Sequence, residues 1–180
     1  LKILTTLVLP TSGDVTVNGY NIKKQGTKVR ESIGIIESKD RSFFWRITGR
    51  QNLEFFAALK NLSKIEAETQ IKELTELLDM NDVIENRFST YSKGMKHRLT
   101  FARSMVNSPS LWFLDEPTTG LDPSIAADIK DIIRVEKKKG TTIFLTTHNM
   151  FIAEELCDRV AFMIDGEIVL IDTPKNLKME

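Results

Sequence analysis

The sequence is poor in cysteine, has no net charge and contains no long apolar run, and each of these absences excludes a class of protein. A single cysteine, Cys157, excludes an intrachain disulfide, so a reducing compartment is the simpler interpretation. The formal net charge is 0, because 25 Lys and Arg residues balance 25 Asp and Glu residues, and no overall field favours nucleic acid. No apolar run approaches the ~18 residues that a membrane-spanning helix needs. The 180 residues are 41% hydrophobic and 28% charged, which fits a packed core.

The apolar pattern alternates between short strands and helices, which predicts an α/β fold with a mostly parallel sheet covered on both faces. Continuous apolar runs predict strands buried on both faces, and Asp165-Gly166 predicts a hairpin turn between residues 160–164 and 167–171. The predicted strands are residues 14–19, 33–36, 111–114 and 142–146. The predicted helices include the end of one at residues 2–9, one capped by Ser92, and one with Asp122 as its N-cap and Pro123 at its first position.

Residues 40–86 have a different, mostly helical character. Two capping boxes, each a Ser or Thr followed three residues later by Gln or Glu, begin at Thr48 and Ser63 and precede apolar faces of helical spacing. This stretch predicts a small helical subdomain inserted between two core segments, residues 1–39 and 87–180.

Polar side chains follow two of the predicted strands. Asp115-Glu116 ends the first, and His148 follows the second. Ligands of open α/β sheets bind beyond the carboxyl ends of the strands, where an Asp can hold Mg²⁺ and a Glu can orient a water. A surface acidic pair is an equally good interpretation of the two carboxylates alone, and a structural histidine is the better interpretation of His148 alone.

The stretch Tyr91-Ser-Lys-Gly-Met95 places Ser-x-Gly at a predicted helix start. Free backbone N–H groups at such an N-terminus bind phosphate, and Lys93 and Lys96 add positive charge. Taken alone, a plain capped helix is the better interpretation.

Together these residues resemble the nucleotide-binding domain of ABC transporters. The match follows the family's order and spacing: residues 91–95 look like its signature, 111–116 like its Walker B strand, 117–122 like its D-loop, and 147–148 like its H-loop. The run from Asp115 to Pro123 is highly specific. Residues 47–53 and the hairpin at 165–166 look like ATPase subunits of ABC-2 type exporters.

The resemblance implies a P-loop NTPase-like three-layer core, with ATP and Mg²⁺ as cofactors. Asp115 would hold Mg²⁺ through water, Glu116 would polarise the attacking water, and His148 would contact the γ-phosphate. Asp122 would connect the two sites of a head-to-tail dimer. The signature would bind the ATP held by the partner domain through Ser92, Lys93, Gly94 and Met95.

The same resemblance implies the partners and the location. A second ABC ATPase domain and a separate membrane permease would be the partners, and nucleic acid would not be one. The protein would lie at the cytoplasmic face of the membrane, held there by the permease. Alternatives are a non-transport ABC protein and a degenerate, non-hydrolysing domain that acts as a regulatory or interaction module; retention of Asp115, Glu116, His148 and Asp122 argues against the degenerate domain.

The sequence departs from the family at several positions. No G-x-x-x-x-G-K-[ST] motif occurs in it, so we expect the 180 residues to begin after the Walker A loop, to lack the N-terminal strands, and to be inactive alone. Glu37-Ser38 stands where the family has the Q-loop Gln, with Ser38 as the nearer match. Lys93 replaces a signature Gly, which suggests help in binding the γ-phosphate, and Met95 replaces Gln. The run Phe43-Phe-Trp45 fits a core cluster and a permease docking patch equally well.

Overall fold

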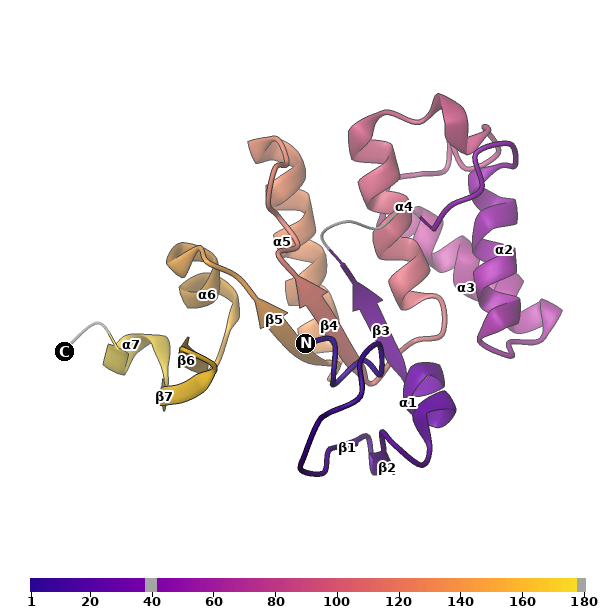
Figure 1. The fold of residues 1–180 in the computed structure, drawn as a ribbon. Helices are drawn as coiled ribbons and strands as arrows, with labels where there is room; N and C mark the ends of the chain where they lie inside the picture. The colour runs from indigo at the N-terminus through magenta and orange to yellow at the C-terminus, as the bar shows by residue number, and fades with distance from the viewer. Residues whose placement is uncertain (38–41, 178–180) are drawn as a thin grey trace.

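The structure is a computed structural model that describes residues 1–37 and 42–177. Its centre is a parallel sheet in the order β3-β4-β5 (Figure 1). The strands are β3 (Ile33–Ile36), β4 (Leu111–Asp115) and β5 (Thr142–Thr146). In the register, Ile36 lies opposite Leu114, and Leu114 lies opposite Leu145, so the carboxyl ends of the strands are level. The predicted parallel α/β sheet is therefore confirmed.

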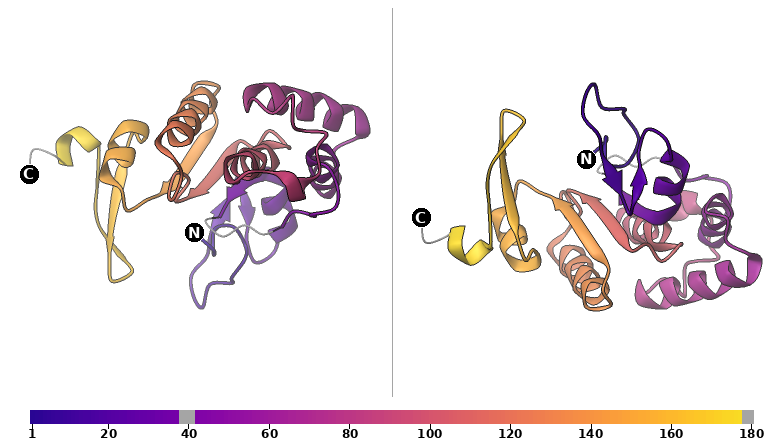
Figure 2. Two further views of the ribbon diagram at one scale, coloured as in Figure 1. Left: turned by 90° about the horizontal axis from the view of Figure 1, so that it is seen from above. Right: turned by 90° about the horizontal axis from the view of Figure 1, so that it is seen from below.

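Strand β4 is buried on both faces, as predicted. Its successive side chains point to opposite sides: Trp112 and Leu114 join one apolar cluster and Phe113 joins another. The first cluster contains the apolar faces of α4 (Lys93–Met105) and α5 (Pro123–Lys138). The second contains residues of the N-terminal segment, which lies on the opposite face of the sheet (Figure 2). The arrangement has three layers, with the sheet in the middle.

Strand β5 was predicted to be buried on both faces, and this is wrong. The Phe144 side chain is 44% exposed. The physical reason is that only one face of β5 is covered: Ile143 and Leu145 pack against the first apolar cluster. Phe144 lies opposite Phe113 on the other face, and the described residues of the second cluster do not extend over it.

The two predicted capping boxes begin the helices α2 (Gly49–Leu59) and α3 (Lys64–Leu77). The side chain of Thr48 accepts a hydrogen bond from the Gln51 backbone, and that of Ser63 accepts one from Glu66. Both helices pack beside α4 (Figure 1) and extend the cluster that lies on the sheet. The helical stretch thus shares its apolar core with the sheet. The subdomain boundaries at residues 40 and 86 stay a prediction.

The N-terminal segment differs from its prediction. Residues 2–9 do not form the end of a helix: residues 2–6 form turns, residues 7–8 form a bend, and Thr6 has a left-handed φ of 63° that interrupts the helical path. The segment continues through three short elements that build the second apolar cluster. These are β1 (Thr16–Val17), β2 (Tyr20–Asn21) and α1 (Gly26–Ser32).

At the other end of the chain, the predicted hairpin is confirmed. Strands β6 (Val160–Ile164) and β7 (Glu167–Asp172) pair antiparallel across Asp165 and Gly166, which have φ angles of 49° and 85°. Two residues of positive φ match the twist of a two-residue hairpin. Helices α6 (Met150–Leu156) and α7 (Pro174–Leu177) flank this hairpin. None of the helices within residues 1–37 and 42–177 is long and apolar enough to cross a membrane.

Gly34 of β3 is required by the close approach of α4 to the sheet. A Cβ atom there would lie 2.3 Å from the Ser104 carbonyl oxygen and 2.8 Å from Cδ1 of Trp112. We expect Gly34→Ala to lower the free energy of unfolding by about 1 to 3 kcal/mol, because a well-packed core cannot admit the methyl group without moving backbone. Urea denaturation followed by circular dichroism measures this change. Gly26→Ala is the matched control, because its nearest neighbour is the flexible end of Arg30 at 3.3 Å; equal loss in both variants would contradict the packing argument.

Candidate functional site

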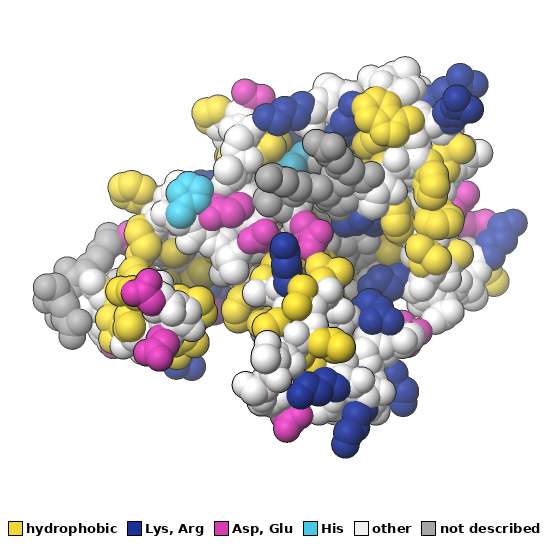
Figure 3. All heavy atoms as spheres, in the orientation of Figure 1, with side chains coloured by type: hydrophobic (Ala, Val, Ile, Leu, Met, Phe, Trp, Pro, Cys, Tyr) yellow, Lys and Arg dark blue, Asp and Glu magenta, His cyan; other side chains and the backbone are white. Residues whose placement is uncertain are grey.

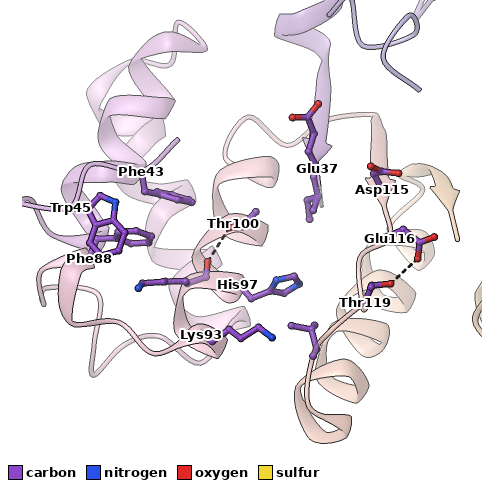
Figure 4. Close-up of a pocket in the computed structure, with 13 residues that line it drawn as sticks. Glu37, Phe43, Trp45, Phe88, Lys93, His97, Thr100, Asp115, Glu116 and Thr119 are labelled. Carbon is purple, nitrogen blue, oxygen red and sulfur yellow. Dashed lines mark hydrogen bonds between the residues drawn. The ribbon is translucent and has the colours of Figure 1, made fainter. Parts of the chain in front are cut away.

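The candidate site lies at the carboxyl ends of the three parallel strands. Glu37 directly follows β3, Asp115 ends β4, and the segment from Thr146 to His148 ends and follows β5. Because the strand ends are level, these groups meet on one rim of the sheet, and Figure 4 shows Glu37, Asp115 and Glu116 there. The sequence predicted that Asp115, Glu116 and His148 would share this rim, and Glu37 was expected near it only from the family resemblance. Ser38, the other predicted Q-loop position, lies outside the described residues.

Asp115 is fixed by its neighbour on β5. The hydroxyl of Thr146 donates a hydrogen bond of 2.6 Å to Oδ1 of the Asp115 carboxylate. Within the described residues, no group of three or more His, Cys, Asp or Glu side chains could hold a metal ion. Mg²⁺ needs only one or two carboxylates when water and phosphate supply its other ligands, so one half-buried carboxylate at a rim fits this ion.

Glu116 accepts more hydrogen bonds than Asp115, its neighbour on the rim. Its backbone has a left-handed φ of 50°, and its N–H donates to the Thr146 carbonyl at 3.0 Å. Its Oε1 accepts from the His148 backbone N–H at 2.9 Å and lies 2.7 Å from Nδ1 of that histidine. Its Oε2 accepts from the Thr119 hydroxyl at 2.8 Å (Figure 4). Glu116 is therefore held between two loops.

The pKa of Glu116 follows from these contacts. Partial burial raises the pKa, but the hydrogen bonds from His148 and Thr119 together outweigh this and hold it below the ordinary value. Glu116 is therefore ionised at neutral pH and can accept a hydrogen bond from a water. Sequence reasoning missed Thr119 and Thr146; the only available signal was that hydroxyl residues stand next to the carboxylates and to His148.

The predicted phosphate-binding stretch forms the start of α4. Ser92 is the N-cap, and its hydroxyl accepts from the Met95 backbone at 3.2 Å, while the Ser92 N–H donates to the Met95 sulfur at 3.4 Å. Methionine thus completes the capping box in place of a side-chain oxygen. Gly94 lets α4 approach α5, because a Cβ there would lie 2.7 Å from Cδ1 of Ile125.

Lys93 makes a contact within this chain that the sequence did not predict. Its ammonium group donates to the carbonyl of Gly120 in the loop that follows Glu116. The hypothesis that Lys93 binds the partner's γ-phosphate therefore competes with a contact inside this chain. Asp122 occupies the N-cap position of α5 with Pro123 at the first turn, as predicted, but its exposed carboxylate makes no capping hydrogen bond.

A cleft of about 690 Å³ separates α4 from the rim of the sheet. Figure 4 shows basic side chains of α4 on one side and carboxylates on the other. Sequence reasoning missed His97 on the α4 side, because its position depends on packing between distant segments. The polar lining is Glu37, Asp115, Glu116 and Thr119 from the rim side, with Lys93, Lys96, His97 and Thr100 from α4. The remaining predicted residues that the structure describes lie outside this lining; they are Ser92, Gly94, Met95, Asp122 and His148.

Comparison with known proteins decides the family. A family profile described as "ABC transporter" matches residues 1–119.

The chain belongs to the ABC transporter family.

Two relatives carry names that mention export or drug resistance. A fluoroquinolones export ATP-binding protein of Mycobacterium tuberculosis is 44% identical over 178 residues, which is 99% of this chain and 58% of that protein. A daunorubicin resistance ATP-binding protein of Streptomyces coeruleorubidus is 36% identical and aligns over 100% of this ABC chain and 57% of its own length. The ABC chain is thus close to ABC-2 type exporter ATPases, and it spans just under three fifths of these relatives.

Solved structures share the fold. The ATP binding subunit of an ABC transporter superposes with a TM-score of 0.87 at 25% identity, over 99% of this ABC chain and 74% of that one. The cbiO1 protein of Clostridium perfringens, described as part of the ABC transporter complex cbiONQ, gives a TM-score of 0.85 at 28% identity. The match covers 99% of this ABC chain and 73% of the cbiO1 chain.

Thr119 can be tested as the residue that holds Glu116. We expect Thr119→Val to raise the pKa of Glu116, because a hydrogen bond donated to the carboxylate favours its ionised form. A carboxyl group whose pKa is lower in the folded state than in the unfolded state stabilises the fold at any pH above its unfolded-state pKa. This stabilisation is lost as the pH falls through the folded-state pKa. The Thr119→Val variant should therefore have a smaller free energy of unfolding at neutral pH. NMR titration of the Glu116 carboxyl carbon measures the shift. Thr118→Val is the matched control, and an unchanged pKa in Thr119→Val would contradict the assignment.

Proposed function

We propose that the protein containing this chain is the ATP-hydrolysing subunit of an ABC-2 type exporter, which drives transport through a separate membrane permease. The observation that carries the proposal is the ionised Glu116, held between His148 and Thr119 beside Asp115 on one rim of a parallel sheet. A degenerate domain has no need to hold a carboxylate at a left-handed φ of 50°. The 180 residues contain no P-loop motif, so we expect this polypeptide to be inactive alone.

The proposed mechanism assigns one task to each group on the rim. Asp115 would hold Mg²⁺, which when bound neutralises charge on phosphate oxygens. Glu116, ionised at neutral pH, would accept a hydrogen bond from the attacking water and orient it. His148, whose side chain is 77% exposed, remains accessible to a phosphate while Glu116 fixes its Nδ1 side.

A second ABC domain would complete the site. Ser92, Gly94 and the free backbone N–H groups of the first turn of α4 lie at a helix N-terminus, where phosphate is favoured. We propose that this end binds ATP held by the partner domain, and that Asp122, with an exposed carboxylate free of capping, connects the two sites. The chain would lie at the cytoplasmic face of the membrane, bound to the permease.

Glu116→Gln in the intact protein tests the proposed hydrolysis. The amide is nearly isosteric but is a poor acceptor and carries no charge, so we expect kcat for ATP hydrolysis to fall by about 10²- to 10⁴-fold while ATP binding is retained. A phosphate-release assay measures kcat, and binding of a fluorescent ATP analogue measures affinity. Glu73→Gln, on the exposed side of α3, is the matched control. An intact protein without ATPase activity would favour the degenerate regulatory domain.

An exposed aromatic patch supports the proposed permease contact. Phe43 is buried at 7% exposure and stacks on Phe88, whereas Phe44, Trp45 and Phe55 are 48%, 58% and 41% exposed. The three exposed rings line a shallow groove of about 590 Å³ together with Arg46 and Ile47. In Figure 3 hydrophobic side chains gather over α2, on the right of the view. Phe43 is thus a core residue, and we assign the proposed docking role to the exposed Phe44 and Trp45 of the same run.

Loss of the patch should weaken permease binding without changing hydrolysis by the free subunit. We expect the double variant Phe44→Ser/Phe55→Ser to bind the permease at least ~10-fold more weakly, because exposed aromatic anchors dominate protein interfaces. Affinity for the permease in detergent measures this effect. Ile65→Ser, at a side chain 76% exposed on α3, is the matched control. Equal affinity of the patch variant and the control would place the permease elsewhere.

A further inference from the structure

Two side chains of α4 hold the loop that follows Glu116. The ammonium group of Lys93 donates to the Gly120 carbonyl, and Nε2 of His97 lies 3.0 Å from the Pro117 carbonyl and donates to it. Lys93 and His97 are four residues apart, so they lie on the same face of the helix. The two acceptors are three residues apart and lie at the two ends of one short loop.

The loop between these anchor points is made of two consecutive turns. The Thr119 N–H donates to the Glu116 carbonyl at 3.2 Å, and the Leu121 N–H donates to the Thr118 carbonyl at 3.3 Å. Gly120 has a φ of +72°, which allows its carbonyl to face α4. The loop thereby places the Thr119 hydroxyl 2.8 Å from Oε2 of Glu116 (Figure 4).

Lys93 and His97 are residue types suited to holding the loop after Glu116, and Lys is not a usual choice at the start of a helix. A Lys in the first turn lies at the positive end of the helix dipole, which disfavours it unless a partner compensates. Here the Gly120 carbonyl is that partner. Burial lowers the pKa of His97. The hydrogen bond to the Pro117 carbonyl raises this pKa and the positive charge of Lys93 lowers it further, and the net pKa lies below the ordinary value. The ring is therefore neutral at neutral pH. A neutral ring has one N–H, and the buried Pro117 carbonyl accepts it.

We propose that Lys93 and His97 are positioning residues that clamp loop 117–120 and, through Thr119, fix the direction of the Glu116 carboxylate. The catalytic part of this inference rests on the proposed function, whereas the ordering of the loop does not. Lys93 therefore acts within its own chain.

Hydrogen exchange in the intact protein tests the clamp without any reference to ATP. We expect Lys93→Met and His97→Phe each to speed exchange of the Thr119 and Leu121 amides by about 10-fold, and Lys93→Arg to restore the slow rate. His97→Phe keeps an aromatic ring against Phe101, whose centroid lies 5.3 Å from that of His97. Lys96→Met is the matched control, because its ammonium lies over Trp45 and not on the loop.

Kinetics separate the clamp from a phosphate contact. We expect Lys93→Met to lower kcat by about 10-fold, since misplacement of a reacting group costs this much or more, with KM for ATP unchanged. If Lys93→Met leaves the hydrogen-exchange rates of the loop unchanged and raises KM for ATP at least ~10-fold, the clamp is overturned and Lys93 is assigned to the partner's phosphate. Unchanged exchange and unchanged kinetics would also overturn it. Faster exchange in a protein without ATPase activity would keep the clamp and reject the proposed function.

Discussion

The parallel register of β3, β4 and β5 is the constraint on which the site depends. The same pairing that sets Ile36 beside Leu114 and Leu114 beside Leu145 makes the next residues of the strands neighbours on one rim. A slip of one residue would exchange the two faces of β4. Trp112 and Phe113 would then leave the apolar clusters in which they are buried. The hydrophobic effect therefore fixes the positions of Asp115 and Glu116, although neither belongs to the core.

Much of the fold could be predicted, because its signals are local. The capping boxes at Thr48 and Ser63 and the apolar run of β4 specify their elements through neighbours in sequence, and the structure contains all three. The exposure of Phe144 on β5 could not be predicted, since it depends on which distant segments pack over that face of the sheet. The turns at residues 2–9 could not be predicted either, because their apolar spacing is equally compatible with a helix.

The candidate site divides in the same way. Asp115, Glu116 and His148 could be placed together because all of them follow strands of one sheet. The contact from Lys93 to Gly120 joins residues 27 apart in the sequence, and the contact from His97 to Pro117 joins residues 20 apart. Side-chain direction over such separations depends on how α4 packs on the sheet, and no short pattern reports it. Trp45 shows the same limit, since Lys96 lies 4.6 Å from the centroid of its ring and ties the aromatic patch to α4.

The left-handed backbone of Glu116 has a consequence for how this chain can change. A residue with a Cβ atom costs about 1 to 2 kcal/mol in that conformation, and glycine would remove the cost. The site therefore stores strain that a stability-optimised sequence would release. The hydrogen bonds that the Glu116 carboxylate accepts from His148 and Thr119 act against that release, because glycine would lose them. Selection for stability alone would therefore weigh a backbone cost against side-chain contacts at position 116, and the charged group at the rim would be lost wherever the backbone cost is the larger.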